Sequence, residues 1–267
     1  MNRMGNPTAD LGASSLADAA DTTNDLYLQL KSIPEKNQIQ VIQELGNVGE
    51  PGLAALMLFL SDRYQTAIAN AVVTDTTDVA PSNSSPVPDP IGGMAYQTLF
   101  NATESEAVAD FLQAHFPQGI VPLRSDAGMD YLPLQQLLAG QQFQAADKLT
   151  IQKMCEVAGA AAVQRKWLYF TEVDQLPIAD LRTIDALWLT HSSGKFGFSV
   201  QRELWLGSGK NWDQLWSKIG WRTNGAWTRY PQEFTWDLSA PKGHLPLSNQ
   251  LRGVRVIAAL FNHPAWV

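Results

Sequence analysis

Two arginines near the end of the chain, Arg252 and Arg255, have a spacing that could hold an acidic ligand. Residues three apart share a face of a helix. No carboxylate follows Asp237, so neither arginine has a partner nearby in the sequence. The planar guanidinium group binds carboxylates and phosphates in a bidentate manner. A solvated charged face is the ordinary alternative, but the pair favours a site for a ligand with acid groups.

The second candidate feature is aromatic. Trp227 lies in residues 224–231 (NGAWTRYP), a segment of turn-forming residues that we expect at the surface, with Tyr230 as its neighbour. A large exposed ring suggests a partner. All nine tryptophans fall between residues 167 and 266. Most of them should be core residues, and Trp227 is the one that we expect to face a ligand.

A flat apolar ligand with carboxylate tails would use both features. Stacking on an aromatic face contributes about 0.5–1.5 kcal/mol beyond area burial. Each charge-assisted hydrogen bond from an arginine contributes about 1.5–3 kcal/mol. Single-stranded nucleic acid fits the same chemistry, but residues 131–267 carry a net charge of only +4, which gives no extended basic track. We therefore expect no nucleic-acid partner.

Enzyme chemistry has no recognisable signature in this sequence. It contains no phosphate-binding G-x-x-x-x-G-K loop, no dinucleotide-binding G-x-G-x-x-G and no nucleophile elbow G-x-S-x-G. The single cysteine, Cys155, falls on an apolar helix face, where a thiol is inert. One histidine could ligate a haem iron, but no feature marks one, and none has a partner at metal-ligand spacing. We expect no catalytic residue, no protein-bound metal and four surface histidines: His115, His191, His244 and His263.

The elements that would position these residues are helices in two units. Residues 1–130 hold 5 Lys/Arg and 16 Asp/Glu, a net charge of −11, whereas residues 131–267 hold 14 and 10. Such a split suggests two units with different roles. We expect a flexible tail over 1–20, an N-terminal helical bundle over 21–130 and a binding domain over 131–267. The longest apolar run, residues 53–60, is too short to span a bilayer.

The apolar pattern predicts helices on both sides of a proline-rich segment at 76–93, and no stretch alternates with period two. In the second unit we expect helices near 132–138 and 142–157, one that opens at Pro177, and a last helix over 247–261 that carries both arginines. Long ordered loops should join them. The fold class is therefore all-α, a helical bundle followed by an all-helical binding domain.

Two long stretches, residues 179–205 and 220–246, take the interpretation further. They include the strings D-L-R-T-I-D-x-L-W, G-x-F-G-F-S-V-Q and A-P-x-G-H-L-P. Together with DYLPLQQLLAGQQFQAADKLT at the start of the second unit, they resemble the genomes-uncoupled-four family of porphyrin-binding proteins over about residues 130–246. The preceding helical unit resembles the extra N-terminal bundle of the cyanobacterial members.

The resemblance implies a non-catalytic regulator of chlorophyll biosynthesis and not an enzyme. Family members bind protoporphyrin IX and magnesium-protoporphyrin IX without requiring an axial protein ligand. They stimulate magnesium chelatase through its H subunit. Their fold is an α-helical cupped hand whose apolar palm holds the macrocycle. By position, the resemblance implies porphyrin contacts from two palm residues, two carboxylate-binding arginines and the aromatic residues of a mobile loop: Phe170, Val173, Arg252, Arg255, Trp227 and Tyr230.

Other interpretations stay open at this stage. The chain could be a protein-interaction scaffold of the chelatase complex, or it could bind a bilin or haem. A tetrapyrrole-modifying enzyme is disfavoured because an acid–base constellation is missing. The first 15 residues resemble neither a secretory signal nor an arginine-rich transit peptide. We therefore expect a cytoplasmic cyanobacterial protein, with peripheral association at the thylakoid membrane as an option, and we expect residues 131–267 alone to bind porphyrin.

Overall fold

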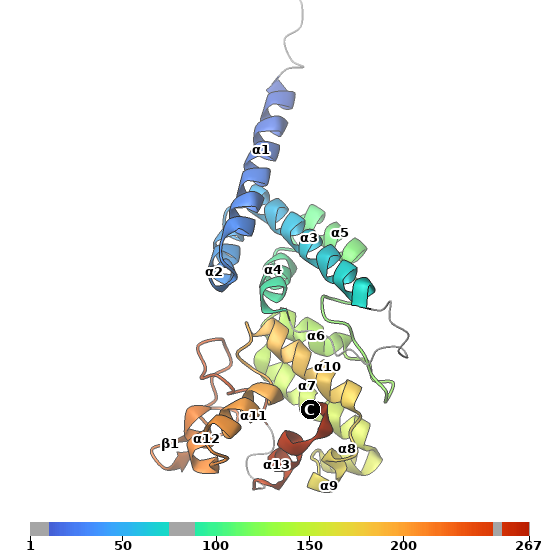
Figure 1. The fold of residues 1–267 in the computed structure, drawn as a ribbon, viewed down its shortest axis with the longest axis vertical. Coiled ribbons are helices and arrows are strands. Elements are labelled where there is room, and N and C mark those ends of the chain that lie inside the picture. Colours follow the sequence, from blue (N-terminus) through green and yellow to red (C-terminus); the bar gives the residue numbers. More distant parts are fainter. Residues whose placement is uncertain (1–10, 75–88, 248–252, 267) are drawn as a thin grey trace, which may run out of the picture. The chain divides into compact units, whose positions relative to one another are not determined.

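The computed structural model describes residues 11–74, 89–247 and 253–266, which Figure 1 draws as ribbons. Within these residues the regular secondary structure is helical, apart from one antiparallel hairpin that pairs β1 (Arg222–Thr223) with β2 (Ala226–Trp227). The prediction of an all-α fold is confirmed. Within the same ranges, no helix combines the length and the apolar character that crossing a bilayer requires.

The chain divides into two compact units. The first contains residues 1–79 and 94–115, and the second contains residues 80–93 and 116–267. This division lies earlier in the chain than the boundary that the sequence suggested near residue 130. The second unit therefore includes the irregular segment that leads into the predicted binding domain.

The described part of the first unit is made of helices. Pro34 stands between the first two helices, and the first helix packs along the third. Leu30, Leu56 and Leu99 are fully buried in its core. Its helices are α1 (Leu11–Ser32), α2 (Glu35–Leu45), α3 (Glu50–Thr74), most of α4 (Pro90–Phe100) and α5 (Glu106–His115).

Part of the segment predicted to be a flexible tail is helical. Helix α1 begins at Leu11, so residues 11–20 are helical and do not belong to the flexible tail expected over 1–20. Residues 1–10 lie outside the described residues, as do residues 75–88 of the proline-rich segment. Helix α4 begins inside that segment, because proline is tolerated in the first turn of a helix.

The second unit holds the predicted binding domain. The helices predicted near 132–138, near 142–157 and after Pro177 are confirmed, each to within one or two residues. Its helical elements are α6 (Leu132–Ala139), α7 (Phe143–Ala158), α8 (Ala160–Arg165), α9 (Phe170–Val173), α10 (Ile178–His191), α11 (Phe198–Gly207), α12 (Trp212–Lys218), α13 (Arg255–Asn262) and the 3-10 turn η2 (Pro264–Trp266).

The last helix is shorter than the predicted helix over 247–261, which was wrong at its start. Leu247 is not helical, and Gly253 has a φ of +82°, in the left-handed region that glycine adopts readily. Helix α13 begins at Arg255. Arg252, which was expected to share a helical face with Arg255, lies outside the described residues.

The D-L-R-T-I-D string fastens the start of α10 to the loop before α6. The buried Asp180 carboxylate accepts hydrogen bonds from the hydroxyl groups of Tyr131 (2.8 Å) and Ser125. It also accepts from the backbone N–H groups of Asp126 (3.0 Å) and Ala127 (3.2 Å). Burial and the neighbouring Asp180 carboxylate raise the pKa of the Tyr131 hydroxyl above its ordinary value. One side chain thus organises a whole loop.

Further along the same string, Asp185 accepts a hydrogen bond from the backbone N–H of Ser199 at the start of α11 (2.9 Å), and burial raises the pKa of Asp185 to about 6.

The other two strings, G-x-F-G-F-S-V-Q and A-P-x-G-H-L-P, are joined by hydrogen bonds. The Gln201 side-chain amide donates to the carbonyl oxygens of Gly243 (3.0 Å) and Pro246 (2.8 Å). The strings that carry the family resemblance therefore build the framework of the second unit.

Most tryptophans lie in or against the hydrophobic core of the second unit, as predicted. Several form a continuous series of ring contacts. The centroids of Trp205 and Trp212 lie 4.9 Å apart, and those of Trp212 and Trp216 lie 5.4 Å apart. From Trp216 the series branches to the fully buried Trp221 (5.5 Å) and to Trp227 (5.7 Å).

The prediction of surface histidines was wrong for three of the four. Burial lowers the pKa of His191 to about 3. His244 is held in one neutral tautomer: Nδ1 donates to the carbonyl oxygen of Ile219 (2.6 Å), and Nε2 accepts from the backbone N–H of Thr235 (3.3 Å). Burial lowers the pKa of His244 as well. The core thus includes three histidines: His191, His244 and His263.

Candidate functional site

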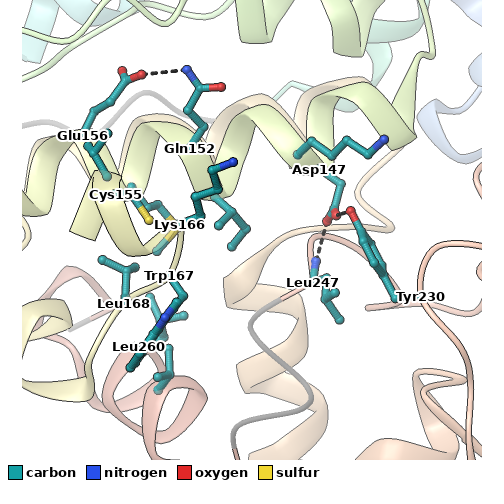
Figure 2. Close-up of a pocket in the computed structure, with 15 residues that line it drawn as sticks. Asp147, Gln152, Cys155, Glu156, Lys166, Trp167, Leu168, Tyr230, Leu247 and Leu260 are labelled. Carbon is teal, nitrogen blue, oxygen red and sulfur yellow. Dashed lines mark hydrogen bonds between the residues drawn. The ribbon is translucent and has the colours of Figure 1, made fainter. Parts of the chain in front are cut away.

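A pocket of about 670 Å³ lies in the second unit along α7. This volume falls within the range of roughly 300–1,000 Å³ that small-molecule sites occupy. Figure 2 shows Tyr230 and Leu247 near Asp147 at one end of the pocket, and Trp167 with Leu168 toward the other end. Helices α7, α8 and α13 and the connection from α8 to α9 supply its apolar lining, which includes Ile151, Met154, Val163, Leu168, Val256 and Leu260.

Polar groups stand at a few points of this apolar lining. Lys148 and Lys166 are exposed lysines that line the pocket, and they could meet the acid groups of a ligand. Glu156 accepts hydrogen bonds from Gln152 (2.8 Å) and Lys153 (3.0 Å). These bonds hold the pKa of Glu156 below its ordinary value. The pocket therefore combines an apolar surface with flexible cations, a combination that suits an amphipathic anion.

Asp147 is the buried acid of the pocket, with 1% of its surface exposed. Its Oδ1 accepts the backbone N–H of Leu247 (2.6 Å), and its Oδ2 accepts the Tyr230 hydroxyl (3.1 Å). Burial raises the pKa of Asp147 to about 7, although both hydrogen bonds and the charge of Lys148 act in the opposite direction. Burial and the Asp147 charge also raise the pKa of the Tyr230 hydroxyl.

Cys155 lines the pocket from α7 without being reactive. The residue is buried, and burial raises the pKa of its thiol to about 11, with a further contribution from the charge of Glu172. A thiol with this pKa is protonated at neutral pH, and the thiolate is the nucleophilic form. The structure thus agrees with the prediction of an inert thiol and adds that the thiol borders the pocket.

Two of the predicted site residues, Phe170 and Arg255, lie together. Helix α9 packs against α13, and the guanidinium carbon of Arg255 lies 5.6 Å from the centroid of the Phe170 ring. Both residues are exposed. Neither lines the pocket, although their neighbours Leu168 and Val256 do. An arginine over an aromatic ring therefore lies close in sequence to two walls of the pocket.

The remaining predicted residues lie in different surroundings. Val173 is fully buried in the hydrophobic core. Trp227 is 43% exposed on β2, with the guanidinium carbon of Arg222 5.8 Å from its ring, so its expected exposure is confirmed. Of the predicted residues that the structure describes, Tyr230 is the one that lines the pocket, and Arg252 lies outside the described residues.

The sequence interpretation missed Asp147, Lys166 and Trp167 as pocket residues. A signal existed for Asp147, because it stands one helical turn after Phe143 and one before Ile151 on an apolar face. A carboxylate in such a place needs a partner. No comparable signal marks Lys166 and Trp167, which only tertiary packing brings to the pocket. No group of three His, Cys, Asp or Glu able to hold a metal ion occurs among the described residues.

Comparison with known families places this site in context. The profile of the GUN4-like family matches residues 124–264, which include the whole lining of the pocket. A second profile, described as an ARM-like repeat domain at the GUN4 N-terminus, matches residues 14–73. The second unit is thus a GUN4-like domain preceded by a helical-repeat domain. The chain belongs to the GUN4 family, which is the genomes-uncoupled-four family that the resemblance predicted.

Individual relatives agree with this assignment. A Ycf53-like protein of Synechocystis is 48% identical over 249 residues, which cover 92% of this chain and 97% of that protein. A chloroplastic protein of Arabidopsis thaliana named tetrapyrrole-binding protein is 37% identical over 142 residues, half of this chain and 54% of that one. The structure of GUN4 from Chlamydomonas reinhardtii superposes with a TM-score of 0.52 at 40% identity, over 55% of this chain and 93% of that one.

Proposed function

We propose that this protein binds protoporphyrin IX and magnesium-protoporphyrin IX in the pocket along α7. We further propose that it is a regulator of chlorophyll biosynthesis, not an enzyme, and stimulates magnesium chelatase through the H subunit. The pocket itself carries the proposal, because its volume and its apolar lining with lysines suit a flat macrocycle with acid tails. Membership of the GUN4 family and the tetrapyrrole-binding Arabidopsis relative support it.

The chain offers one kind of contact for each part of a porphyrin. Ile151, Met154 and Leu260 would cover the apolar faces of the ring, since burial of apolar surface contributes about 25 cal/mol per Å². Trp167 would add an aromatic face. None of the described residues that line the pocket is a histidine, so the proposal requires no axial ligand from them, and a haem would receive no histidine ligand there.

Binding can be tested directly by titrating deuteroporphyrin IX or protoporphyrin IX against the tryptophan fluorescence of the full chain. We expect saturable quenching, because the pocket lies in the tryptophan-rich second unit and Trp167 lines it. Magnesium chelatase assays with and without the protein then test the regulatory part. A protein that shows no quenching at any porphyrin concentration would contradict the binding proposal.

The acid groups of the porphyrin allow a sharper test. Replacing Arg252 and Arg255 together by alanine should raise the Kd for deuteroporphyrin IX at least about tenfold, since each charge-assisted bond contributes about 1.5–3 kcal/mol. The dimethyl ester of the same porphyrin has no free acid groups, so its Kd should change little between the wild type and the double arginine variant. A Lys148→Ala, Lys166→Ala double variant is the matched comparison. If only the lysine variant loses diacid affinity, the acid groups bind at the lysines and the arginine assignment is wrong.

Deletion of the first unit should leave porphyrin binding intact, because every lining residue belongs to the second unit. We expect residues 131–267 alone to bind, and we expect residues 116–267 to bind with a Kd within about threefold of the full chain. The shorter fragment should unfold more easily, because it lacks the Ser125 and Asp126 donors to Asp180. Circular dichroism melts and quenching titrations check both. Loss of binding by a folded 116–267 fragment would place the first unit in the site.

A second candidate function is a protein-interaction scaffold of the chelatase complex. The first unit favours it, since helical repeats of the ARM type stack into extended surfaces that bind partners. This unit also exposes several large apolar side chains, namely Leu28, Val48, Leu58 and Tyr64. Chelatase stimulation by variants that have lost porphyrin affinity separates the two candidates. Full stimulation without porphyrin binding supports the scaffold, and a parallel loss supports the porphyrin-dependent role.

We also propose that the protein is cytoplasmic in a cyanobacterium and associates peripherally with the thylakoid membrane. The Synechocystis relative supports the cyanobacterial setting. Fractionation of cells into soluble and thylakoid material, followed by immunoblotting, tests the location.

A further inference from the structure

The Asp147 carboxylate joins three distant parts of the chain at one end of the pocket (Figure 2). Asp147 lies on α7, Tyr230 follows the hairpin, and Leu247 lies in the segment before α13. The hydrogen bond from Tyr230 spans 83 residues of sequence, and the one from Leu247 spans 100 residues. All three residues line the pocket. A single side chain therefore holds two pocket-lining segments against α7, which lines the pocket as well.

This arrangement is unlike ordinary core packing. A buried carboxylate costs free energy unless hydrogen bonds compensate its desolvation, and Asp147 accepts two such bonds, from Tyr230 and Leu247. The hydrogen bond from Tyr230 to Asp147 also positions the aromatic rings that pack against Tyr230. Tyr230 packs edge-on against Phe234, with centroids 5.6 Å apart, and against Trp236 at 5.7 Å. The carboxylate thus fixes an aromatic cluster as well as the Leu247 backbone.

We propose that Asp147 is the positioning residue of the pocket: by holding Tyr230 and Leu247 against α7, its carboxylate keeps this end of the pocket in the arrangement that binds a flat tetrapyrrole. The inference rests on the proposed function. Asp147 need not touch the ligand, because it acts through two residues that do line the pocket. Without the tether, both segments lose their hydrogen bonds to α7 and become less ordered, and the ligand must order them when it binds, which costs affinity.

The main interactions of Asp147 are its hydrogen bonds with Tyr230 and Leu247, and few charged groups lie near it. Lys148 is its cationic neighbour on α7, and the Tyr230 hydroxyl faces it from the segment after the hairpin. Lys166 and Glu156 line the same pocket from other positions. A carboxyl group keeps a carbonyl acceptor for the Leu247 N–H when it is protonated. The tether therefore depends on the shape and hydrogen-bonding groups of the side chain more than on its charge, and an amide should replace it.

The test compares three variants of the full chain, with deuteroporphyrin IX as the probe. Asp147→Asn keeps both tethers, because its Oδ1 accepts the Leu247 N–H and its amide donates to the Tyr230 oxygen. Asp147→Ala removes both, and Tyr230→Phe removes one. We expect the Kd to rise at least about tenfold in Asp147→Ala, about threefold in Tyr230→Phe and less than threefold in Asp147→Asn. Hydrogen exchange of the Leu247 amide, measured without ligand, should quicken at least tenfold in Asp147→Ala only.

Rescue by the amide separates positioning from a general loss of stability, because Kd is measured well below the melting temperature of each folded variant. The proposal is overturned if Asp147→Ala binds as tightly as the wild type, or if Asp147→Asn binds as weakly as Asp147→Ala. If Asp147→Ala does not fold, the comparison of Tyr230→Phe with Asp147→Asn decides, and equal affinities for these two variants and the wild type overturn it. Failure of the wild type to bind porphyrin would instead contradict the proposed function, while the Leu247 exchange rates would still report the tether.

Discussion

Replacing Asp180 by alanine should destabilise the second unit by about 3 kcal/mol, because each buried donor left without a partner costs about 1–3 kcal/mol. The Tyr131 hydroxyl is fully buried and loses its acceptor, while Ser125 and the two backbone donors can recover bonds to water. For a unit of this size such a change lowers the melting temperature by roughly 6–12 °C. Thermal unfolding followed by circular dichroism measures it.

Asp180→Asn should rescue little, because its amide nitrogen would face the backbone N–H groups of Asp126 and Ala127, which need an acceptor. The matched control is Asp126→Asn, which removes the same charge from an exposed side chain and leaves the backbone donor in place. We expect this control within about 0.5 kcal/mol of the wild type. A melting temperature of Asp180→Ala equal to that of the control would show that the carboxylate does not hold the loop.

Asp147→Asn should become more stable relative to the wild type as the pH rises from about 4 to about 7. In the folded protein burial raises the pKa of Asp147 to about 7, whereas the ordinary value is 3.8. Between these values the folded state holds a proton that the unfolded state has released. The free energy of unfolding therefore falls as the pH rises through this window, and the contribution stays constant above about pH 7. The amide does not titrate and avoids this loss.

The slope is at most about 1.4 kcal/mol for each tenfold change in proton concentration, so the total difference should be on the order of 2–4 kcal/mol. Urea unfolding of both proteins at pH 5, 6, 7 and 8 measures the difference. Asp185 and His191, whose pKa values are also displaced by burial, are present in both proteins and cancel. A difference that is the same at every pH would show that Asp147 has an ordinary pKa in the folded state.

The helices that the sequence predicted correctly carry strong local signals. Helix α7 has an apolar face at helical spacing, and Pro177 stands at the N-terminal boundary of α10. The start of α13 was predicted wrongly because tertiary bonds override the periodicity there. Leu247 donates its N–H to Asp147, and the carbonyl oxygen of Pro246 is bound by Gln201. These bonds hold Pro246 and Leu247 in a non-helical conformation that no local pattern reveals.

The candidate site was less predictable than the fold. The recognised strings identify the family, but their polar residues, such as Asp180 and Gln201, hold the framework together and do not line the pocket. Tyr230 was predicted as a site residue from its aromatic segment, and the structure places it in the lining. Asp147 was missed even though an acid on an apolar helix face is a visible anomaly. Lys166 and Trp167 reach the pocket only through the packing of α8 and α9, which spacing along the chain does not encode.

The tryptophan series also has an optical consequence. Rings that lie 4.9 to 5.7 Å apart exchange excitation energy by resonance transfer before they emit, so Trp205, Trp212, Trp216, Trp221 and Trp227 behave as one antenna. A ligand that accepts energy from any one of these tryptophans lowers the fluorescence of the whole series. The emission should therefore report occupancy of the pocket with high sensitivity, whereas the ring that contacts the ligand is identified by the change in affinity of single-ring variants.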